Sequence, residues 1–254
     1  MKLPIPWALP TRPVTRSQLL GTGVTPAMLR TAVGSDRLLV LRRGVYIAAT
    51  AWPDDPTGQH LMLAHAEQVA NPTAVLSHQS AALAWRLSNP GITRWAELPV
   101  SVTLPSDGHT SRSGTVTHHV GPLPSDQIAI DDDGYALTTP ARTAVDLAAD
   151  LEIPQALVLL DSAARRTCQG FIASPRRRDL ANPRLSEAAR QLLQASAATR
   201  GIARLDRAIG LASPLRESAA ESLSAGHFFL AGLPEPVLQA EIRTPIGVFY
   251  PDFY

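Results

Sequence analysis

Apolar and polar positions alternate through Leu38–Ala48, where two apolar arms flank the polar centre formed by Arg42, Arg43 and Gly44. Alternation over four to eight residues is typical of strands, and a glycine between two such runs supplies a tight turn. The segment is therefore predicted to be a β-hairpin with two arginines at its tip.

The residues before this hairpin carry start and stop signals for two short helices. Thr15 is a plausible N-cap for the first helix, which Gly21–Val24 interrupts. Thr25 followed by Pro26 opens a second helix that runs toward Leu38, with apolar residues at helical spacing. Two short helices joined by a glycine turn and followed by a hairpin predict a winged helix-turn-helix over residues 1–50.

In that geometry the second helix lies in the major groove of double-stranded DNA and the hairpin is the wing. The candidate DNA-binding residues are Arg30, Arg37, Arg42, Arg43 and Gly44, with Gly44 supplying the turn. The alternative from the residues alone is a small helical unit whose hairpin is only structural.

Residues 57–166 mix helical and strand patterns, which predicts an α+β domain. The expected strands include Leu98–Pro105 with Ser113–Val120 as its antiparallel partner, and a hairpin around Gly134. The expected helices are His60–Val69, Ser77–Leu87 with Ser77 as cap, Thr139–Leu151 with Thr139 as cap, and 154–166.

Three groups in this domain resemble catalytic or metal-binding patterns. His118 and His119 are neighbours on a predicted strand and should face opposite sides, which argues against one shared metal site. Asp131–Asp133 lack the alternating spacing of a calcium loop and predict a solvated turn. Ser77 and His78 suggest a nucleophile and base, but neighbours at a helix start usually cap and pack. No catalytic residue is predicted here.

A basic, helix-rich segment follows at residues 167–212. Arg176–Arg178 are expected in an exposed loop, and two further helices break near Gly201. Arg200, Arg204 and Arg207 could share one helix face. This segment either forms a second nucleic-acid surface or docks on the acidic middle domain.

Charge is distributed in blocks, although the formal net charge of the 254 residues is only +1. Residues 1–50 hold seven basic and one acidic residue, 51–163 four and 13, 164–216 eleven and three, and 217–254 one and five. A basic first unit suits nucleic acid, and the acidic middle should repel it. The chain has no apolar run of membrane-spanning length, and its single cysteine, Cys168, is expected to be a buried thiol, so a cytoplasmic protein is predicted.

Three stretches carry a family resemblance: RLLVLRRGVYIA at Arg37–Ala48, the helix SHQSAALAW, and LTTPARTAVDLAADL at Leu137–Leu151. In this order they resemble AbiEi-type antitoxins of type IV toxin–antitoxin systems and their actinobacterial relatives. The resemblance implies a winged helix followed by an antitoxin-type α+β domain, with DNA binding that represses the protein's own operon. It also implies a nucleotidyltransferase-like toxin as a possible partner.

Residues 213–254 are similar to the beginning of a PD-(D/E)xK nuclease module of the very-short-patch-repair type. A helix at Pro214–Ala231 would present Glu217 and Glu221 on one face, and two strands would follow, with Asp252 in the PD position. That fold holds Mg²⁺ with its acidic residues. The strand with the (D/E)xK pattern is missing, so the three acidic residues are expected to be vestigial metal ligands, with Mg²⁺ bound only if another chain completes the site.

The sequence therefore predicts an α+β regulator that binds DNA and is not an enzyme, and whose tail is an incomplete restriction-endonuclease-like module. The alternatives are a Mg²⁺-dependent DNA endonuclease completed by another chain, and a protein-interaction module whose hairpin is structural.

Overall fold

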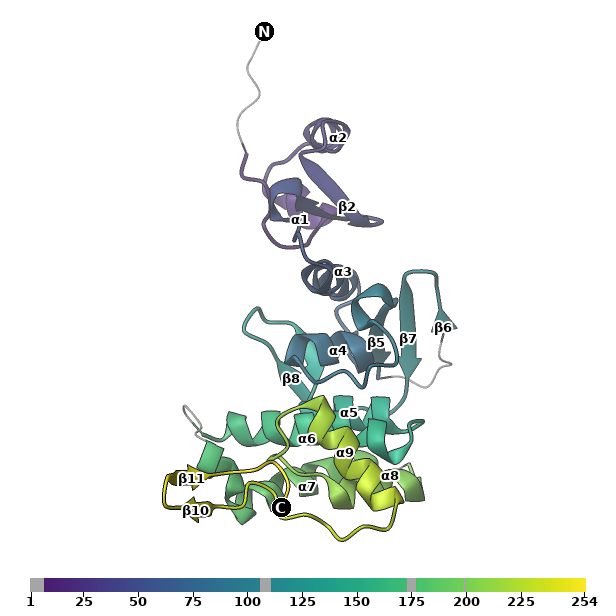
Figure 1. Cartoon of the computed structure of the whole chain (residues 1–254). Coiled ribbons are helices and arrows are strands. Elements are labelled where there is room, and N and C mark those ends of the chain that lie inside the picture. Colours follow the sequence, from purple (N-terminus) through teal and green to yellow (C-terminus); the bar gives the residue numbers. More distant parts are fainter. Residues whose placement is uncertain (1–6, 106–110, 173–176, 199) are drawn as a thin grey trace. The chain divides into compact units, whose positions relative to one another are not determined.

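The computed structural model describes the whole chain except residues 1–6, 106–110, 173–176 and 199 (Figure 1). The fold is mixed α+β, as predicted. Its contacts divide the chain into two compact units, each discontinuous in sequence. Unit 1 contains Met1–Leu76, Ala96–Leu123 and Ile130–Leu137, and unit 2 contains Ser77–Trp95, Pro124–Ala129 and Thr138–Tyr254.

Unit 1 begins with two helices and a three-stranded antiparallel sheet of order β1-β3-β2. The elements are β1 (Val14–Thr15), α1 (Arg16–Gly21), α2 (Pro26–Gly34), β2 (Leu38–Arg42) and β3 (Val45–Ala48). The two helices and the hairpin are confirmed, although α2 ends earlier than predicted. Buried Leu19, Val24, Leu29, Ala32 and Leu38 form the core of this part.

Local caps explain where these helices begin. The Thr15 hydroxyl accepts a hydrogen bond from the backbone N–H of Gln18, whose side chain in turn accepts one from the Thr15 N–H, which is a capping box. Thr25 caps α2 through the Met28 N–H, with Pro26 in the first turn.

A six-stranded sheet of order β6-β7-β5-β4-β9-β8 follows. The strands are β4 (Val75–Leu76), β5 (Val100–Leu104), β6 (Ser111–Arg112), β7 (Val116–Val120), β8 (Ile128–Ile130) and β9 (Ala136–Thr138). Helix α3 (Pro56–Ala70) contacts both sheets: β1, β2 and β3 of the three-stranded sheet, and β4 and β5 of the six-stranded sheet. Short 3₁₀ helices occur at Ala49–Ala51, Trp95–Glu97 and Ser125–Gln127.

The predicted antiparallel pairing of the two strands around residues 98–120 is wrong. β5 and β7 are parallel, with Val100 opposite Val116 and Leu104 opposite Val120. The antiparallel partner of β7 is instead the short strand β6, which lies in the connection between them. A parallel pair cannot be joined by a tight hairpin turn, and β6 lies between β5 and β7 in the sequence.

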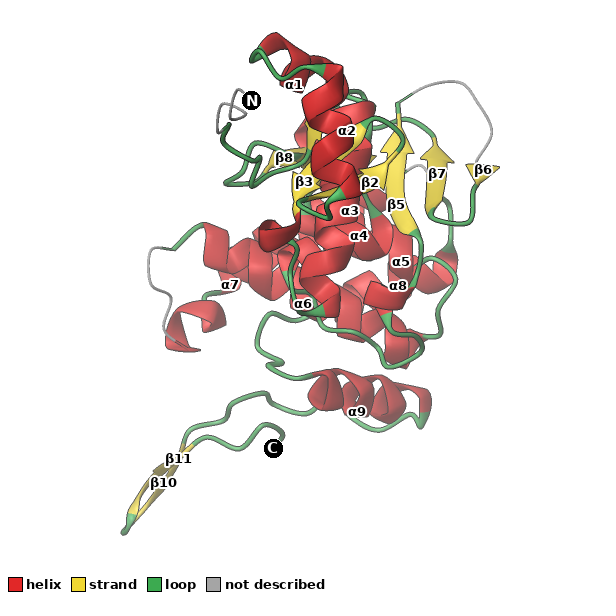
Figure 2. Ribbon diagram, turned by 90° about the horizontal axis from the view of Figure 1, so that it is seen from above, coloured by secondary structure: helices red, strands yellow, loops and turns green. Residues whose placement is uncertain are grey.

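Unit 2 is mainly helical (Figure 2). Its helices are α4 (His78–Trp85), α5 (Pro140–Ala148), α6 (Ile153–Gly170), α7 (Pro183–Ala197), α8 (Ala203–Leu211) and α9 (Ala219–Leu230), with a 3₁₀ helix at Arg177–Ala181. The long helix α6 contacts α5, α7, α8 and α9, and Leu157, Leu159 and Leu160 are fully buried on it. No helix of the described chain is both long enough and apolar enough to span a bilayer.

Several boundaries in unit 2 differ from the predictions. Arg176 lies outside the described residues, and Arg177 begins a 3₁₀ helix instead of lying in a loop. The two basic helices and their break near Gly201 are confirmed as α7 and α8. The last helix begins at Ala219 instead of Pro214, because Ser218 is its N-cap.

The C-terminal residues form a two-stranded antiparallel hairpin of β10 (Ile242–Thr244) and β11 (Gly247–Phe249). The sequence patterns Val237–Arg243 and Gly247–Phe253 predict two longer strands than these. Val237 and Tyr254 exchange backbone hydrogen bonds of 2.9 and 3.0 Å, which brings the two ends of this segment together.

Candidate nucleic-acid interface

Helix α2 presents Arg30 to solvent. Its neighbour Leu29 and the nearby Ala32 are buried on the opposite face, which fixes the helix on the core. Among the described residues, the Arg30 guanidinium has no hydrogen-bond or ion-pair partner. The cation is therefore available to an external anion.

The hairpin turn consists of Arg43 and Gly44, because Arg42 is paired with Val45. Gly44 has a φ of +81°, a conformation that glycine adopts readily, and this confirms the tight turn expected there. The Gly44 carbonyl accepts a 2.8 Å hydrogen bond from the Arg16 backbone N–H. The Arg43 side chain is exposed and has no partner among the described residues.

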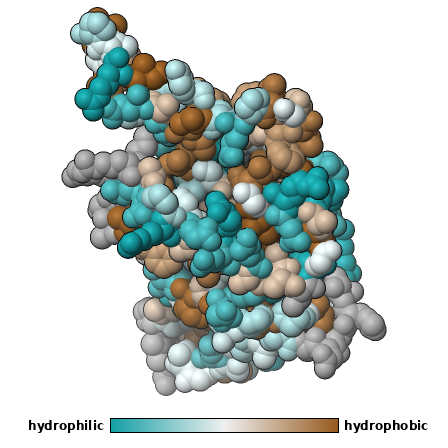
Figure 3. Space-filling view, turned by 90° about the horizontal axis from the view of Figure 1, so that it is seen from below, coloured by the Kyte–Doolittle hydropathy of each residue, from teal (hydrophilic) through white to brown (hydrophobic). Residues whose placement is uncertain are grey.

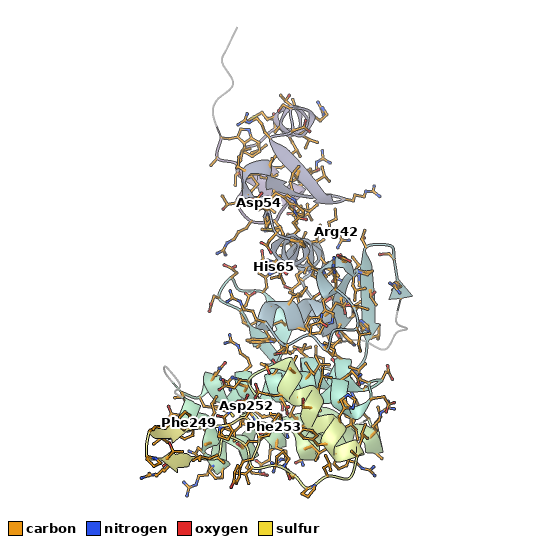
Figure 4. The ribbon with its side chains drawn as sticks, viewed as in Figure 1. Arg42, Asp54, His65, Phe249, Asp252 and Phe253 are labelled. Carbon is orange, nitrogen blue, oxygen red and sulfur yellow. The ribbon has the colours of Figure 1, made fainter. Side chains whose placement is uncertain are left out.

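Arg42 lies in a different environment from Arg43. Its Nη1 donates a hydrogen bond to Oε2 of Glu67, a carboxylate on α3 that is only 3% exposed. The other oxygen of Glu67, Oε1, lies 3.2 Å from Nε2 of His118 on β7. Figure 4 shows the labelled Arg42 side chain near α3. Arg42 is thus tied to α3 through the buried Glu67, although its own side chain is still 39% exposed.

Arg37 directly precedes the first residue of β2. Its carbonyl accepts a 3.0 Å hydrogen bond from the Ala49 N–H, and its side chain is exposed. Arg16, which the sequence reasoning missed, is also exposed and is joined through its backbone to the turn glycine. Its only sequence signal was its place directly after the Thr15 cap. Among the exposed arginines of this part of unit 1, Arg16, Arg30, Arg37 and Arg43 have no side-chain partner within the described residues.

The two histidines of β7 have different partners. His118 contacts Glu67, and Nε2 of His119 lies 3.4 Å from the Ser101 hydroxyl. Burial lowers the pKa of His119 below its usual value, and the neighbouring His118 acts in the same direction. Within the described residues, no group of three or more His, Cys, Asp or Glu side chains is arranged to hold a metal ion.

The acidic turn before Gly134 is a hairpin that Asp131 organises. Oδ1 of Asp131 accepts hydrogen bonds from the backbone N–H groups of Asp133 and Tyr135, at 2.9 and 2.8 Å. The ring of Tyr135 stacks on His65 of α3, with 3.7 Å between the ring centroids. These contacts give the turn a structural role within unit 1.

Ser77 and His78 lie at the start of α4. Ser77 occupies the N-cap position, as predicted, but its side chain makes no capping hydrogen bond. Instead its hydroxyl lies 3.0 Å from His78 Nδ1, and His78 has a positive φ of 47° that turns its side chain toward Ser77. Ser77 is completely buried, which closes its hydroxyl to a substrate.

The three expected vestigial metal ligands have separate partners. Glu217 precedes α9 and forms an ion pair with Arg165, so the expected shared face with Glu221 does not exist. Glu221 lies in the first turn of α9, where its N–H donates to the N-cap Ser218 hydroxyl and its carboxylate accepts hydrogen bonds from the Ser218 hydroxyl and the Glu217 N–H. Asp252, labelled in Figure 4, accepts a long 3.4 Å hydrogen bond from Gln239.

Arginines of the basic segment bind acidic residues of the preceding helices. Arg200 binds Asp146 on α5, which also accepts a 2.8 Å hydrogen bond from Arg142, and burial raises the pKa of Asp146. Arg204 binds Glu152 at 2.8 Å. Arg200 precedes α8, so it does not share a helix face with Arg204 and Arg207. These contacts favour the docking alternative for this segment.

The single cysteine, Cys168, is buried on α6, as expected. Its thiol donates to the Leu185 carbonyl at 3.4 Å, and burial raises its pKa, which keeps it protonated and unreactive.

No protein-family model matches this chain, and no curated protein matches it.

Proposed function

We propose that the protein is a DNA-binding transcriptional regulator whose first 50 residues act as a winged helix-turn-helix. The order of elements supports this proposal: a short strand, two helices joined by a tight turn, and a hairpin whose returning strand pairs with the first strand. In such a module α2 is the recognition helix and the β2–β3 turn is the wing.

The observation that carries the proposal is the exposed guanidinium of Arg30 on α2, which has no partner among the described residues. An exposed arginine on a recognition helix can form bidentate hydrogen bonds to guanine or bind phosphate. Arg43 at the turn and Arg16 and Arg37 nearby in the sequence supply further cations for the phosphate backbone.

Arg42 has a supporting role in this proposal. Its bond to the buried Glu67 fixes β2 against α3, and Arg43 is the arginine of the pair that contacts DNA. Arg42 thus anchors the wing to α3, and Arg43 is left to contact DNA.

The antitoxin part of the proposal rests on the resemblance of Arg37–Ala48 and Leu137–Leu151 to AbiEi-type antitoxins. It adds repression of the protein's own operon in the cytoplasm and neutralisation of a nucleotidyltransferase-like toxin. The acidic residues Asp146 and Asp161 are buried and bind arginines of the same chain, so they do not contact such a toxin.

A nuclease activity has no comparable support. Glu217, Glu221 and Asp252 each bind another part of the chain, and Glu221 is occupied by helix capping.

Fluorescence anisotropy with a duplex from the region upstream of the gene tests this proposal. Arg30→Ala should weaken binding by about tenfold or more and reduce the preference over a random duplex. Arg207→Ala, which removes another exposed arginine, this one from α8, is the control and should leave affinity unchanged. Equal affinities of wild type and Arg30→Ala would contradict the proposal.

A further inference from the structure

A buried carboxylate in unit 1 joins the hairpin to strand β7. Glu67 on α3 is only 3% exposed, whereas charged side chains usually lie on the surface, where hydrophilic residues, in teal, cover much of the face in Figure 3. Its Oε2 accepts a hydrogen bond from Arg42 Nη1, and its Oε1 lies 3.2 Å from His118 Nε2. Because a carboxylate can only accept hydrogen bonds, His118 Nε2 carries the hydrogen of this contact.

A register shift in the hairpin directs Arg42 toward α3. The pairing of β2 with β3 shifts between Val40 and Arg42, which leaves Leu41 as an extra residue on β2. An extra residue reverses the side to which the following side chains point. Without it, Arg42 would lie on the face of Leu38, which packs in the core with α1 and α2, and it could not reach Glu67 on α3.

The turn of the hairpin is held on both sides of Arg43. Arg42, directly before it, binds Glu67, and the Gly44 carbonyl, directly after it, accepts a 2.8 Å hydrogen bond from the Arg16 N–H. Two such anchors restrict the position of the residue between them. The exposed guanidinium of Arg43 therefore starts from a fixed backbone, which lowers the conformational entropy lost when it binds a phosphate.

His118 determines the orientation of the carboxylate that holds Arg42. The terminal torsion of a glutamate has broad minima, so a carboxylate with one partner can rotate. A second partner on the other oxygen removes this freedom, and it also satisfies a buried oxygen that would otherwise cost free energy. With His118 on Oε1, the other oxygen of Glu67 faces Arg42.

We propose that His118 is a positioning residue for the wing, a role that rests on the proposed DNA-binding function. Through Glu67 and Arg42, His118 holds the β2–β3 turn where Arg43 contacts the phosphate backbone. His118 itself does not contact DNA, and its effect on affinity passes through α3.

Hydrogen exchange of the Arg16 amide tests this role in the free protein, because its N–H binds the Gly44 carbonyl of the turn. His118→Phe keeps a ring and removes the donor, and it should speed this exchange by about fivefold or more. The Leu29 amide of α2, which donates to the Thr25 carbonyl, is the internal reference and should exchange as in the wild type. Equal acceleration of both amides would mean that His118 only stabilises the fold, and this would overturn the proposal.

Two further variants show whether the donor of His118 is what matters. His118→Gln places an amide N–H near the carboxylate and should restore exchange of the Arg16 amide to near the wild-type rate. His119→Phe is the matched control on the same strand, because His119 faces the opposite side and lies near Ser101. It should leave the Arg16 amide unchanged. If His118→Phe does not fold in urea titrations, His118→Leu takes its place.

A double-mutant cycle tests the path from His118 to the wing. If His118 acts through Arg42, His118→Phe should add nothing to the exchange rate of the Arg16 amide once Arg42→Ala is present. Independent, multiplied effects of the two substitutions would contradict the proposed path.

Fluorescence anisotropy with duplex DNA completes the test. His118→Phe should weaken binding by about threefold, and His118→Gln should bind nearly as the wild type does. An unchanged Arg16 amide in His118→Phe overturns the proposal whatever the affinity. Faster exchange with unchanged affinity also overturns it if Arg43→Ala weakens binding. If Arg43→Ala binds as tightly as the wild type, the proposed DNA contact of the wing fails, and the role of His118 fails with it.

Discussion

Arg42 on β2 binds the buried carboxylate of Glu67 on α3, although its neighbour Arg43 is exposed and has no partner among the described residues. Two adjacent arginines of one hairpin therefore differ in what they contact. Arg42 is the last residue of β2 and reaches Glu67, whereas Arg43 lies in the turn that follows.

The first prediction separates these two arginines by their effect on stability. Arg42→Ala leaves Glu67 with one fewer partner in a buried position and should lower the free energy of unfolding by about 2 kcal/mol. Arg43→Ala should stay within about 0.5 kcal/mol of wild type. Urea unfolding of both variants measures this difference, and equal stabilities would show that the Arg42–Glu67 contact does not hold the hairpin.

The second prediction concerns the packing of α9 on α6. A Cβ atom at Gly226 would lie 2.4 Å from Pro154 Cα, which is backbone and cannot move aside cheaply. Gly226→Ala should therefore destabilise the protein by about 2 kcal/mol or more. Gly210→Ala is the control, because nothing lies within 4 Å of its added Cβ and alanine favours helices by about 1 kcal/mol. A stabilised Gly226→Ala variant would refute this packing.

The third prediction concerns Glu221. Its carboxylate accepts hydrogen bonds from the Glu217 N–H and the Ser218 hydroxyl at the start of α9, so Glu221→Ala should lower stability by about 1 kcal/mol. We expect no metal-dependent cleavage of plasmid or linear DNA by the wild-type chain in Mg²⁺ or Mn²⁺. Cleavage that Glu221→Ala loses would overturn the assignment and favour an endonuclease.

The fourth prediction concerns pH. Burial lowers the pKa of His65 below its usual value, although the nearby Asp131 opposes this shift. Between that lowered pKa and about 6.5, the unfolded chain binds more protons than the folded protein, so stability should fall as pH falls through this window. His65→Phe keeps a ring against Tyr135 and removes the titration. The loss of stability between pH 7.5 and pH 5.5 should be smaller in this variant, and an unchanged loss would contradict the account.

Short-range signals in the sequence predicted the elements of this fold well. The hydroxyls of Thr15, Thr25 and Thr139 each cap a helix by accepting a hydrogen bond from the backbone N–H three residues later. The turn at Gly44 depends only on the positive φ that this glycine adopts. Such interactions are local, so the residues that form them lie within one short window of sequence.

Long-range pairings could not be predicted in the same way. Arg42 and Glu67 are 25 residues apart, and Asp146 and Arg200 are 54 residues apart. The parallel pairing of β5 and β7 depends on the path of the connection between them. The sequence therefore predicted the candidate DNA-binding arginines as a group, but the structure was needed to distinguish the anchoring Arg42 from the exposed Arg43 and to add Arg16.

The dependence of DNA affinity on salt concentration tests the central claim most directly. If Arg30 and Arg43 both neutralise phosphates, the double variant Arg30→Ala/Arg43→Ala should remain folded, bind more weakly, and lower the slope of log affinity against log salt by about 2. An unchanged slope and affinity in the folded double variant would contradict the claim that this module binds DNA through its exposed arginines.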